Sequence, residues 1–175
     1  MLDTDSLIDW MLLEGYCNNM DLEYGNVAYC MSEENGGQWK LVMYDMDATF
    51  RSPQLLYLNL LAPEYPDPSQ TSLLILSLLK NSDFRERVLL RASELYSGPL
   101  RDEELIARMD GYAALLAPEM PRAFEKLGRS GASWEYAVNE LKNMVLSASW
   151  HDTCIDRLCQ YLKVSPEERA LYFGD

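Results

Sequence analysis

The sequence predicts a mainly α-helical protein of the α+β class that contains one small β-hairpin. From Thr71 nearly to the C-terminus, apolar residues recur at helical spacing, whereas strand-like runs are confined to residues 26–45 around a Gly-Gly turn. A length of 175 residues is that of one domain with its own core.

The first helix is predicted within "DTDSLIDWMLLEGYCNN", residues 3–19. It opens with a choice of Asp, Thr or Ser as N-cap, and its apolar side chains recur every three or four residues. Asn18 and Asn19 should stop it. The next two segments, "NVAYCM" (26–31) and "WKLVMYD" (39–45), are rich in strand-forming residues, and "SEENGGQ" between them predicts a hairpin turn.

Residues 51–70 contain four of the eight prolines and predict a loop or short helices. The remainder is punctuated by Gly98-Pro99, by the glycines of 128–131 and by Ser165-Pro166. Helices are predicted over 70–80, 82–97, 101–116, 118–127, 131–148, 150–163 and 166–172.

The composition and net charge of the chain argue against some classes of binding partner. Apolar residues make up 48% and charged residues 25%, as in soluble globular proteins. The net charge of −13 argues against nucleic acid and anionic membranes, and it favours a basic partner or one reached through a cation. The N-terminus has no signal-peptide pattern and no apolar run is long enough to span a membrane, so the chain as given is expected in the cytoplasm.

The segment "HDTCIDRLC" places His151, Cys154 and Cys159 close together and raises the alternative of a metal cluster. The spacing is poor for a metal site and no fourth ligand stands nearby. We therefore expect buried thiols on the packed face of an amphipathic helix.

Four polar residues frame the hairpin: Asp21 and Asn26 precede or enter its first strand, and Asp45 and Asp47 follow its second. Phosphoryl transfer needs an Asp to orient the attacking hydroxyl, and an Asn and an Asp to hold Mg²⁺ on the phosphates. D-x-x-x-x-N, a hairpin and an Asp follow one another in protein kinases as they do here. Asn19-Met20 replaces the usual His-Arg, however, and "DMD" replaces Asp-Phe-Gly. Ordinary turn residues at a solvated strand end remain the alternative.

The same stretch resembles the CotH family of spore-coat and secreted kinase-like proteins. The likeness is carried by "DTDSLID", "NNMD", "NVAY" and "YDMDATF". The later segments "LLKNSDFRERVLLRASEL", "PEMPRAFEKLG" and "SWEYAVNELKNMVLSASWHDTCIDRLCQYL" also look like the helical half of that family. The resemblance predicts a CotH kinase-like region over residues 3–164 and a tail over 165–175.

The resemblance implies an atypical kinase that transfers phosphate from ATP to protein Ser or Thr with Mg²⁺ or Mn²⁺. Asp21 would be the catalytic residue, and Asn26, Asp45 and Asp47 would be metal ligands. The fold would resemble the C-terminal lobe of a protein kinase. The substrate would be a Ser-rich, basic coat or surface protein, and the full-length protein would act at the spore coat or cell surface.

The chain departs from fuller members of the family because no Gly-rich phosphate loop and no Lys-bearing hairpin precede Asp21. The resemblance therefore implies the C-terminal part of a CotH-type protein, lacking the nucleotide-binding lobe and weakly active alone. Two other readings stay open. One is a catalytically inactive scaffold for coat assembly from the same family, and the other is an unrelated helical interaction domain.

Overall fold

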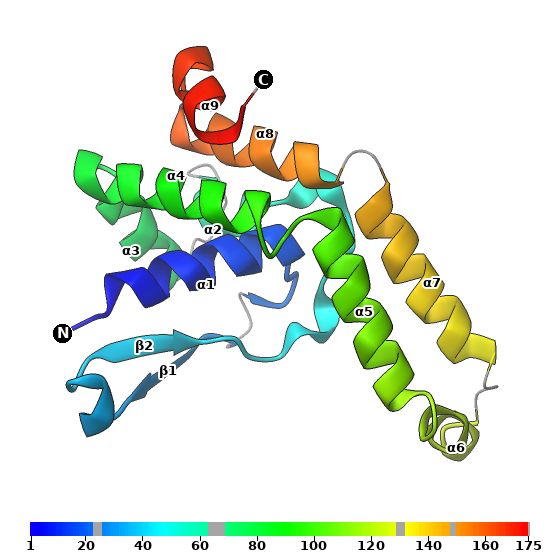
Figure 1. Cartoon of the computed structure of the whole chain (residues 1–175). Helices are drawn as coiled ribbons and strands as arrows, with labels where there is room; N and C mark the ends of the chain where they lie inside the picture. The colour runs from blue at the N-terminus through cyan, green and yellow to red at the C-terminus, as the bar shows by residue number, and fades with distance from the viewer. Residues whose placement is uncertain (23–25, 63–68, 129–131, 148–149, 175) are drawn as a thin grey trace. The chain divides into compact units, whose positions relative to one another are not determined.

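The computed structural model describes residues 1–22, 26–62, 69–128, 132–147 and 150–174. The described chain is mainly helical with one two-stranded antiparallel sheet, which confirms the predicted composition of the fold (Figure 1). It divides into two compact units, Met1–Glu94 with Asp152–Asp175, and Leu95–His151. No helix within the described ranges is both long and apolar enough to cross a membrane.

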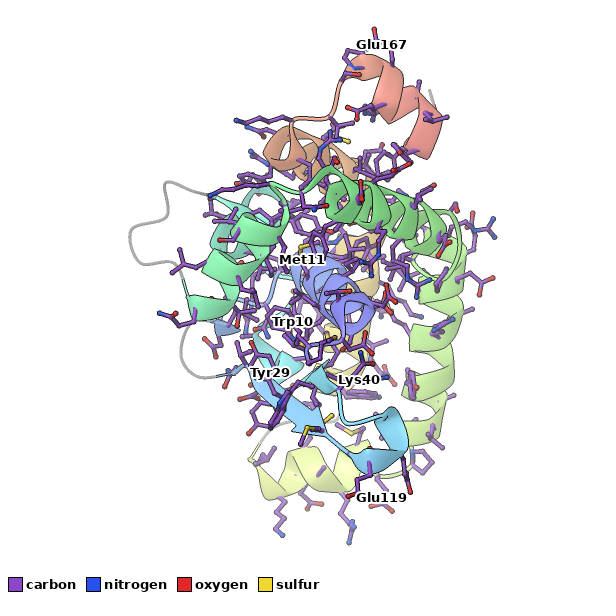
Figure 2. All side chains as sticks on the ribbon, turned by 90° about the vertical axis from the view of Figure 1, so that its left-hand side faces the viewer. Trp10, Met11, Tyr29, Lys40, Glu119 and Glu167 are labelled. Carbon is purple, nitrogen blue, oxygen red and sulfur yellow. The ribbon has the colours of Figure 1, made fainter. Side chains whose placement is uncertain are left out.

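Helix α1 (Thr4–Cys17) is largely buried in the first unit. The carboxylate of Asp3 caps its first turn by accepting the backbone N–H groups of Asp5 and Ser6, both at 3.0 Å. Figure 2 shows Trp10 and Met11 among the side chains of the interior. The helix ends where predicted, because Asn18 takes the left-handed conformation with φ 51°. The buried residues of α1 are Leu7, Ile8, Trp10, Met11, Leu12, Glu14, Gly15 and Tyr16.

The hairpin consists of β1 (Ala28–Met31) and β2 (Trp39–Val42), joined through the short 3-10 helix η2 (Glu33–Asn35). Gly36 and Gly37 have φ of +66° and +68°, which L side chains rarely adopt, so these glycines allow the turn. The predicted strands are confirmed, although the hydrogen-bonded part is shorter than each sequence run.

Several polar contacts join the hairpin to the start of α1, among them the bond from the backbone N–H of Asp3 to the carbonyl of Trp39 at 2.9 Å. The backbone N–H of Leu41 donates to the hydroxyl of Ser6 at 3.0 Å. The ammonium group of Lys40 lies 3.3 Å from the carboxylate of Asp3. The hairpin and α1 therefore form one rigid support for the residues that follow each of them.

The connecting segment after β2 contains η3 (Met46–Ala48), η4 (Pro53–Leu55) and the single helical turn α2 (Leu58–Leu61). Over residues 51–62 this agrees with the predicted mixture of loop and short helix, and residues 63–68 of that prediction lie outside the described residues. Tyr57 is fully buried and lies against Gly15 of α1 so closely that a Cβ at Gly15 would sit 1.9 Å from the ring carbon Cε1. The glycine is therefore required by packing.

Four further helices belong wholly or mostly to the first unit. Their bounds agree with the predicted helices to within two residues. Arg85 and Glu168 form an ion pair at 2.8 Å in this unit. Cys154 and Cys159 are buried thiols outside any disulfide, as predicted. The helices are α3 (Gln70–Leu78), α4 (Ser82–Ser97), α8 (Trp150–Leu162) and α9 (Pro166–Phe173).

The second unit contains α5 (Asp102–Leu116), α6 (Met120–Lys126) and α7 (Ala132–Leu146). Neither α5 nor α6 has a buried residue. An ion pair between Lys142 and Asp110 joins α7 to α5. This unit is therefore an open helical arrangement with much of its apolar surface in solvent.

Candidate active site

The stretch that follows α1 lies against the stretch that follows β2. The backbone N–H of Met20 donates to the carbonyl oxygen of Ala48 at 3.1 Å, and the N–H of Phe50 donates to that of Cys17 at 2.7 Å. These bonds hold the segment with the predicted catalytic carboxylate beside the segment with the predicted metal ligands. Residues far apart in the sequence thus meet at one end of the hairpin.

The strand register explains why the predicted ligands share that end. Ala28 lies opposite Val42, so the strands leave the pairing in the direction of Asn26 on one side and Asp45 on the other. The hairpin turn is at the opposite end. The proximity of these two backbone positions follows from the register, while the roles of their side chains remain predictions.

The three carboxylates at this end are exposed to solvent. Those of Asp21, Asp45 and Asp47 make no hydrogen bond or ion pair with any residue that the structure describes. Asp45 has φ 53° and ψ 59°, and its side chain does not cap the helix η3 that follows it. A left-handed non-glycine residue is a strained conformation that is common at functional sites. The carboxylates are thus available to a ligand.

The donor set suits one kind of metal site. Within the described ranges, no three His, Cys, Asp or Glu side chains cluster so as to hold a metal by themselves. The predicted set instead offers the carboxylates of Asp45 and Asp47 and the amide oxygen of Asn26. Mg²⁺ commonly binds through one or two carboxylates together with phosphate and water oxygens. These residues therefore fit a metal that arrives with a nucleotide.

A sequence model described as CotH kinase protein matches residues 1–150. The chain belongs to the CotH kinase family. The match includes all four predicted site residues, the hairpin and the helices as far as α7 (Ala132–Leu146). Comparisons with curated proteins and with solved structures give no match. The predicted extent of 3–164 and the residue roles stay predictions.

Sequence reasoning assigned Asn18 and Asn19 of this CotH-family chain only to the end of a helix, and it missed what their side chains do. Both are buried, with exposed fractions of 2% and 1%. The side-chain amide of Asn18 donates to the backbone carbonyl of Ser52 at 3.2 Å. The side-chain amide of Asn59 donates to the backbone carbonyl of Asn19 at 2.9 Å. Two adjacent asparagines directly after an apolar helix were the available signal.

Glu14 of the CotH-family chain is a buried carboxylate just before this loop, with an exposed fraction of 1%. Neither of its oxygens has a hydrogen-bonding partner of normal geometry in the described part of the chain. Burial raises the pKa of Glu14 to about 7, and the nearby amide of Asn19 offsets this only in part. Burial, together with the negative charge of Glu14, also raises the pKa of Cys17 to about 12.

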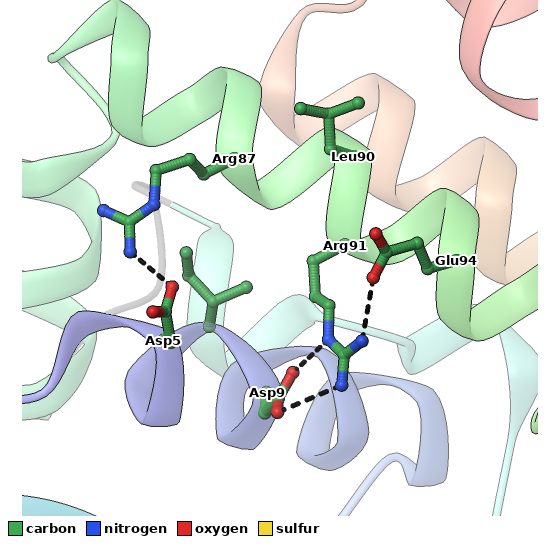
Figure 3. A pocket seen from close by; sticks show the side chains of 7 residues that line it. Asp5, Asp9, Arg87, Leu90, Arg91 and Glu94 are labelled. Atoms are coloured by element: carbon green, nitrogen blue, oxygen red, sulfur yellow. Dashed lines mark hydrogen bonds and ion pairs between the residues drawn. The ribbon is translucent and has the colours of Figure 1, made fainter.

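A concave surface of the CotH-family chain lies between α1 and α4, apart from the candidate site, and has a volume of about 390 Å³ (Figure 3). Arg91 binds Asp9 through two nitrogens, at 2.6 and 3.3 Å, and Glu94 through a third at 2.8 Å. Arg87 pairs with Asp5 through a single nitrogen one helical turn earlier (Figure 3). Because the guanidinium groups on this surface are paired with carboxylates, we interpret it as a set of ion pairs that joins α1 to α4.

Proposed function

We propose that this chain is the catalytic part of a CotH-type protein kinase, which transfers the γ-phosphate of ATP to Ser or Thr of a protein substrate with Mg²⁺ or Mn²⁺. The helical unit with its hairpin would correspond to the C-terminal lobe of an atypical protein-kinase-like fold. An inactive scaffold for coat assembly is the alternative within the same family.

One observation carries the proposal beyond family membership. Two backbone hydrogen bonds join the segment that contains Asp21 to the segment that contains Asp45 and Asp47. The exposed carboxylates on these segments are not engaged by other described residues. Phosphoryl transfer requires such a meeting of a hydroxyl-orienting carboxylate with metal-binding oxygens.

Each residue has a distinct role in the proposed reaction. Asp21 accepts a hydrogen bond from the substrate hydroxyl and takes its proton as the oxygen bonds to the γ-phosphorus and ADP leaves. Asn26 and Asp45 would hold the metal ion, and Asp47 would hold a second or complete the first. When bound, the metal neutralises charge on the transferring phosphate.

The charge of the chain supports a basic substrate. With 28 acidic and 15 basic residues, the protein attracts positively charged segments and repels polyanions. We therefore propose a Ser-rich, basic protein as the acceptor. Nucleic acid and anionic membranes are not proposed as partners.

The proposal is tested with the full chain, Mn²⁺, labelled ATP and a Ser-rich basic acceptor protein. Asp21→Asn and Asp45→Asn remove one charge each with little change in shape. We expect each to lower the transfer rate by at least about 100-fold, because each removes a group that acts in the transition state. Glu34→Gln makes the same charge change at the turn end of the hairpin and should leave the rate unchanged.

The outcomes separate the two candidates. Transfer that is lost in both site variants and retained in Glu34→Gln establishes the kinase and the two roles. If the wild-type chain captures the acceptor but transfers no label and binds neither Mn²⁺ nor ATP, the scaffold replaces the kinase.

A further inference from the structure

The side chain of Asn19 contacts both halves of the proposed active site. Its Oδ1 accepts the backbone N–H of Asp21 at 3.2 Å. Its Nδ2 donates to the carbonyl oxygen of Asp45 at 3.4 Å and to the sulfur of Met46 at 3.6 Å. A single amide thus touches the backbone of the proposed catalytic residue and that of the proposed principal metal ligand.

The amide itself is held in place from behind. The backbone N–H of Asn19 donates to the carbonyl of Glu14 at 3.3 Å, and its carbonyl accepts the side chain of Asn59 at 2.9 Å. Only 1% of Asn19 is exposed to solvent. Because the backbone of Asn19 is fixed and its amide is buried, the amide can hold the groups that it binds in a defined position.

The chemistry of an amide matches this double contact. Its oxygen accepts and its nitrogen donates, so its two ends can bind one N–H group and one carbonyl group at once. An ionised Asp in the same place would keep the acceptor and lose the donor. The two contacts can therefore be separated by an isosteric substitution.

The contact with Asp45 matters because that residue has a left-handed backbone, with φ 53°, which an aspartate can adopt but can also exchange for the β or right-handed region. Surrounding contacts bias the residue towards the left-handed conformation. The bond from Asn19 is one of those contacts. Relaxation would turn the Asp45 carboxylate away from its place at the end of the hairpin.

We infer that Asn19 is a positioning residue that sets the Asp45 backbone relative to Asp21, and thereby the metal affinity and turnover of the site. The assignment of those two residues to metal and proton rests on the proposed function, whereas the coupling between them does not. Asn19 itself would contact neither substrate nor metal.

The test compares Asn19→Asp with Asn18→Gly in the full chain. Asn18→Gly removes the hydrogen bond from the same loop to Ser52, and glycine suits the left-handed backbone of this position. The Asn18 side chain of the wild type touches neither Asp21 nor Asp45. Three quantities are measured: Mn²⁺ affinity, kcat and KM for ATP, and amide hydrogen exchange at Asp21 and Met20, whose N–H groups are both hydrogen-bonded. Thermal unfolding identifies a variant that fails to fold, and Asn59→Ala then serves as the second variant.

For Asn19→Asp we expect Mn²⁺ affinity and kcat to fall roughly 10- to 100-fold, as for other residues that orient metal ligands. Exchange at Met20, whose N–H donates to the carbonyl of Ala48 at 3.1 Å, should accelerate more than in Asn18→Gly, because Asn19 loses its donor to the segment that contains Ala48. In Asn18→Gly, the affinity and kcat should stay within about twofold of wild type.

The outcomes distinguish this inference from the proposed function. If Asn19→Asp matches Asn18→Gly in exchange and in Mn²⁺ affinity, the positioning role is overturned even though the kinase stands. If the wild-type chain neither binds Mn²⁺ nor transfers phosphate, while exchange at Met20 still accelerates only in Asn19→Asp, the coupling holds and the kinase function fails.

Discussion

Helices α1 and α5 each contain a glycine inside a helical turn, and the two glycines have opposite surroundings. Gly15 of α1 is buried, and an added Cβ would overlap the ring of Tyr57. Gly111 of α5 is exposed, and an added Cβ would meet nothing within 4 Å. Packing thus requires a glycine at position 15, whereas nothing that the structure reveals requires one at position 111.

This difference extends to the helices themselves. Eight residues of α1 are buried, and the helix leads directly into the loop that carries Asp21. No residue of α5 is buried. We therefore expect substitutions around α1 to change stability and site geometry together, and substitutions on α5 to act locally.

The largest expected effect is that of Gly15→Ala. Alanine favours an isolated helix by about 1 kcal/mol over glycine, but here its Cβ would lie 1.9 Å from a ring carbon of the buried Tyr57. The ring cannot retreat freely, because its hydroxyl donates to the carbonyl of Leu12 at 3.2 Å. We expect the free energy of unfolding to fall by ~4 kcal/mol, measured by chemical denaturation.

A companion variant identifies the cause of that loss. Gly15→Ala combined with Tyr57→Leu removes the ring that causes the overlap. The two changes should be strongly non-additive, with the alanine costing less in the double variant than alone. Additive losses would contradict the proposed clash.

Glu14→Gln should have the next largest effect, and it should stabilise. The pKa of Glu14 rises from an ordinary 4.5 to about 7 in the fold, so the folded state holds a proton that the unfolded state has released. The contribution of Glu14 to stability is therefore highest below pH 4.5 and declines as the pH rises to about 7. At ~1.4 kcal/mol per pKa unit, ionisation costs on the order of 3 kcal/mol.

Glutamine never ionises, so Glu14→Gln should exceed the wild type by about that amount above pH 8 and match it near pH 4. Denaturation curves across this range measure the difference. A constant offset between the two proteins at all pH values would show that Glu14 keeps an ordinary pKa.

Features of the molecule that depend on neighbouring residues could be predicted from the sequence, whereas features that depend on distant partners could not. Helix bounds in 70–172 followed from caps, glycines and prolines, which act locally. The convergence of the backbone positions of Asn26 and Asp45 followed from their order around a hairpin, because a two-stranded antiparallel pair fixes which ends meet, whereas the roles of these residues stay predictions. The adjacent asparagines Asn18 and Asn19 were a visible signal, but their hydrogen-bonding partners could not be predicted, because these lie tens of residues away in the sequence.

Arg85→Met should destabilise by an intermediate amount. The guanidinium binds both carboxylate oxygens of Glu168, at 2.8 and 3.1 Å, and its Nε donates to the carbonyl of Leu162 at 3.0 Å. Loss of these contacts should lower the free energy of unfolding at neutral pH, by less than Gly15→Ala does, because the Glu168 carboxylate is exposed to solvent while the bond to the Leu162 carbonyl is also lost.

The loss should also depend on pH. Hydrogen bonding to Arg85 and to the backbone of Ser165 lowers the pKa of Glu168 from 4.5 to about 2. The stability from this pair is therefore complete above pH 4.5 and is lost as the pH falls towards 2. In Arg85→Met that acid-dependent decline should weaken, and an unchanged decline would argue that Arg85 does not hold the carboxylate.

The smallest effect, and the opposite sign from Gly15→Ala, is expected for Gly111→Ala. Nothing obstructs the added methyl group, and alanine reduces the backbone entropy of the unfolded chain, so α5 should gain ~0.5–1 kcal/mol. Slower amide exchange along Asp102–Leu116 would report the gain locally, and phosphate transfer should not change. A destabilised α5 would mean that a partner surface covers Gly111, and would end the contrast between the two units.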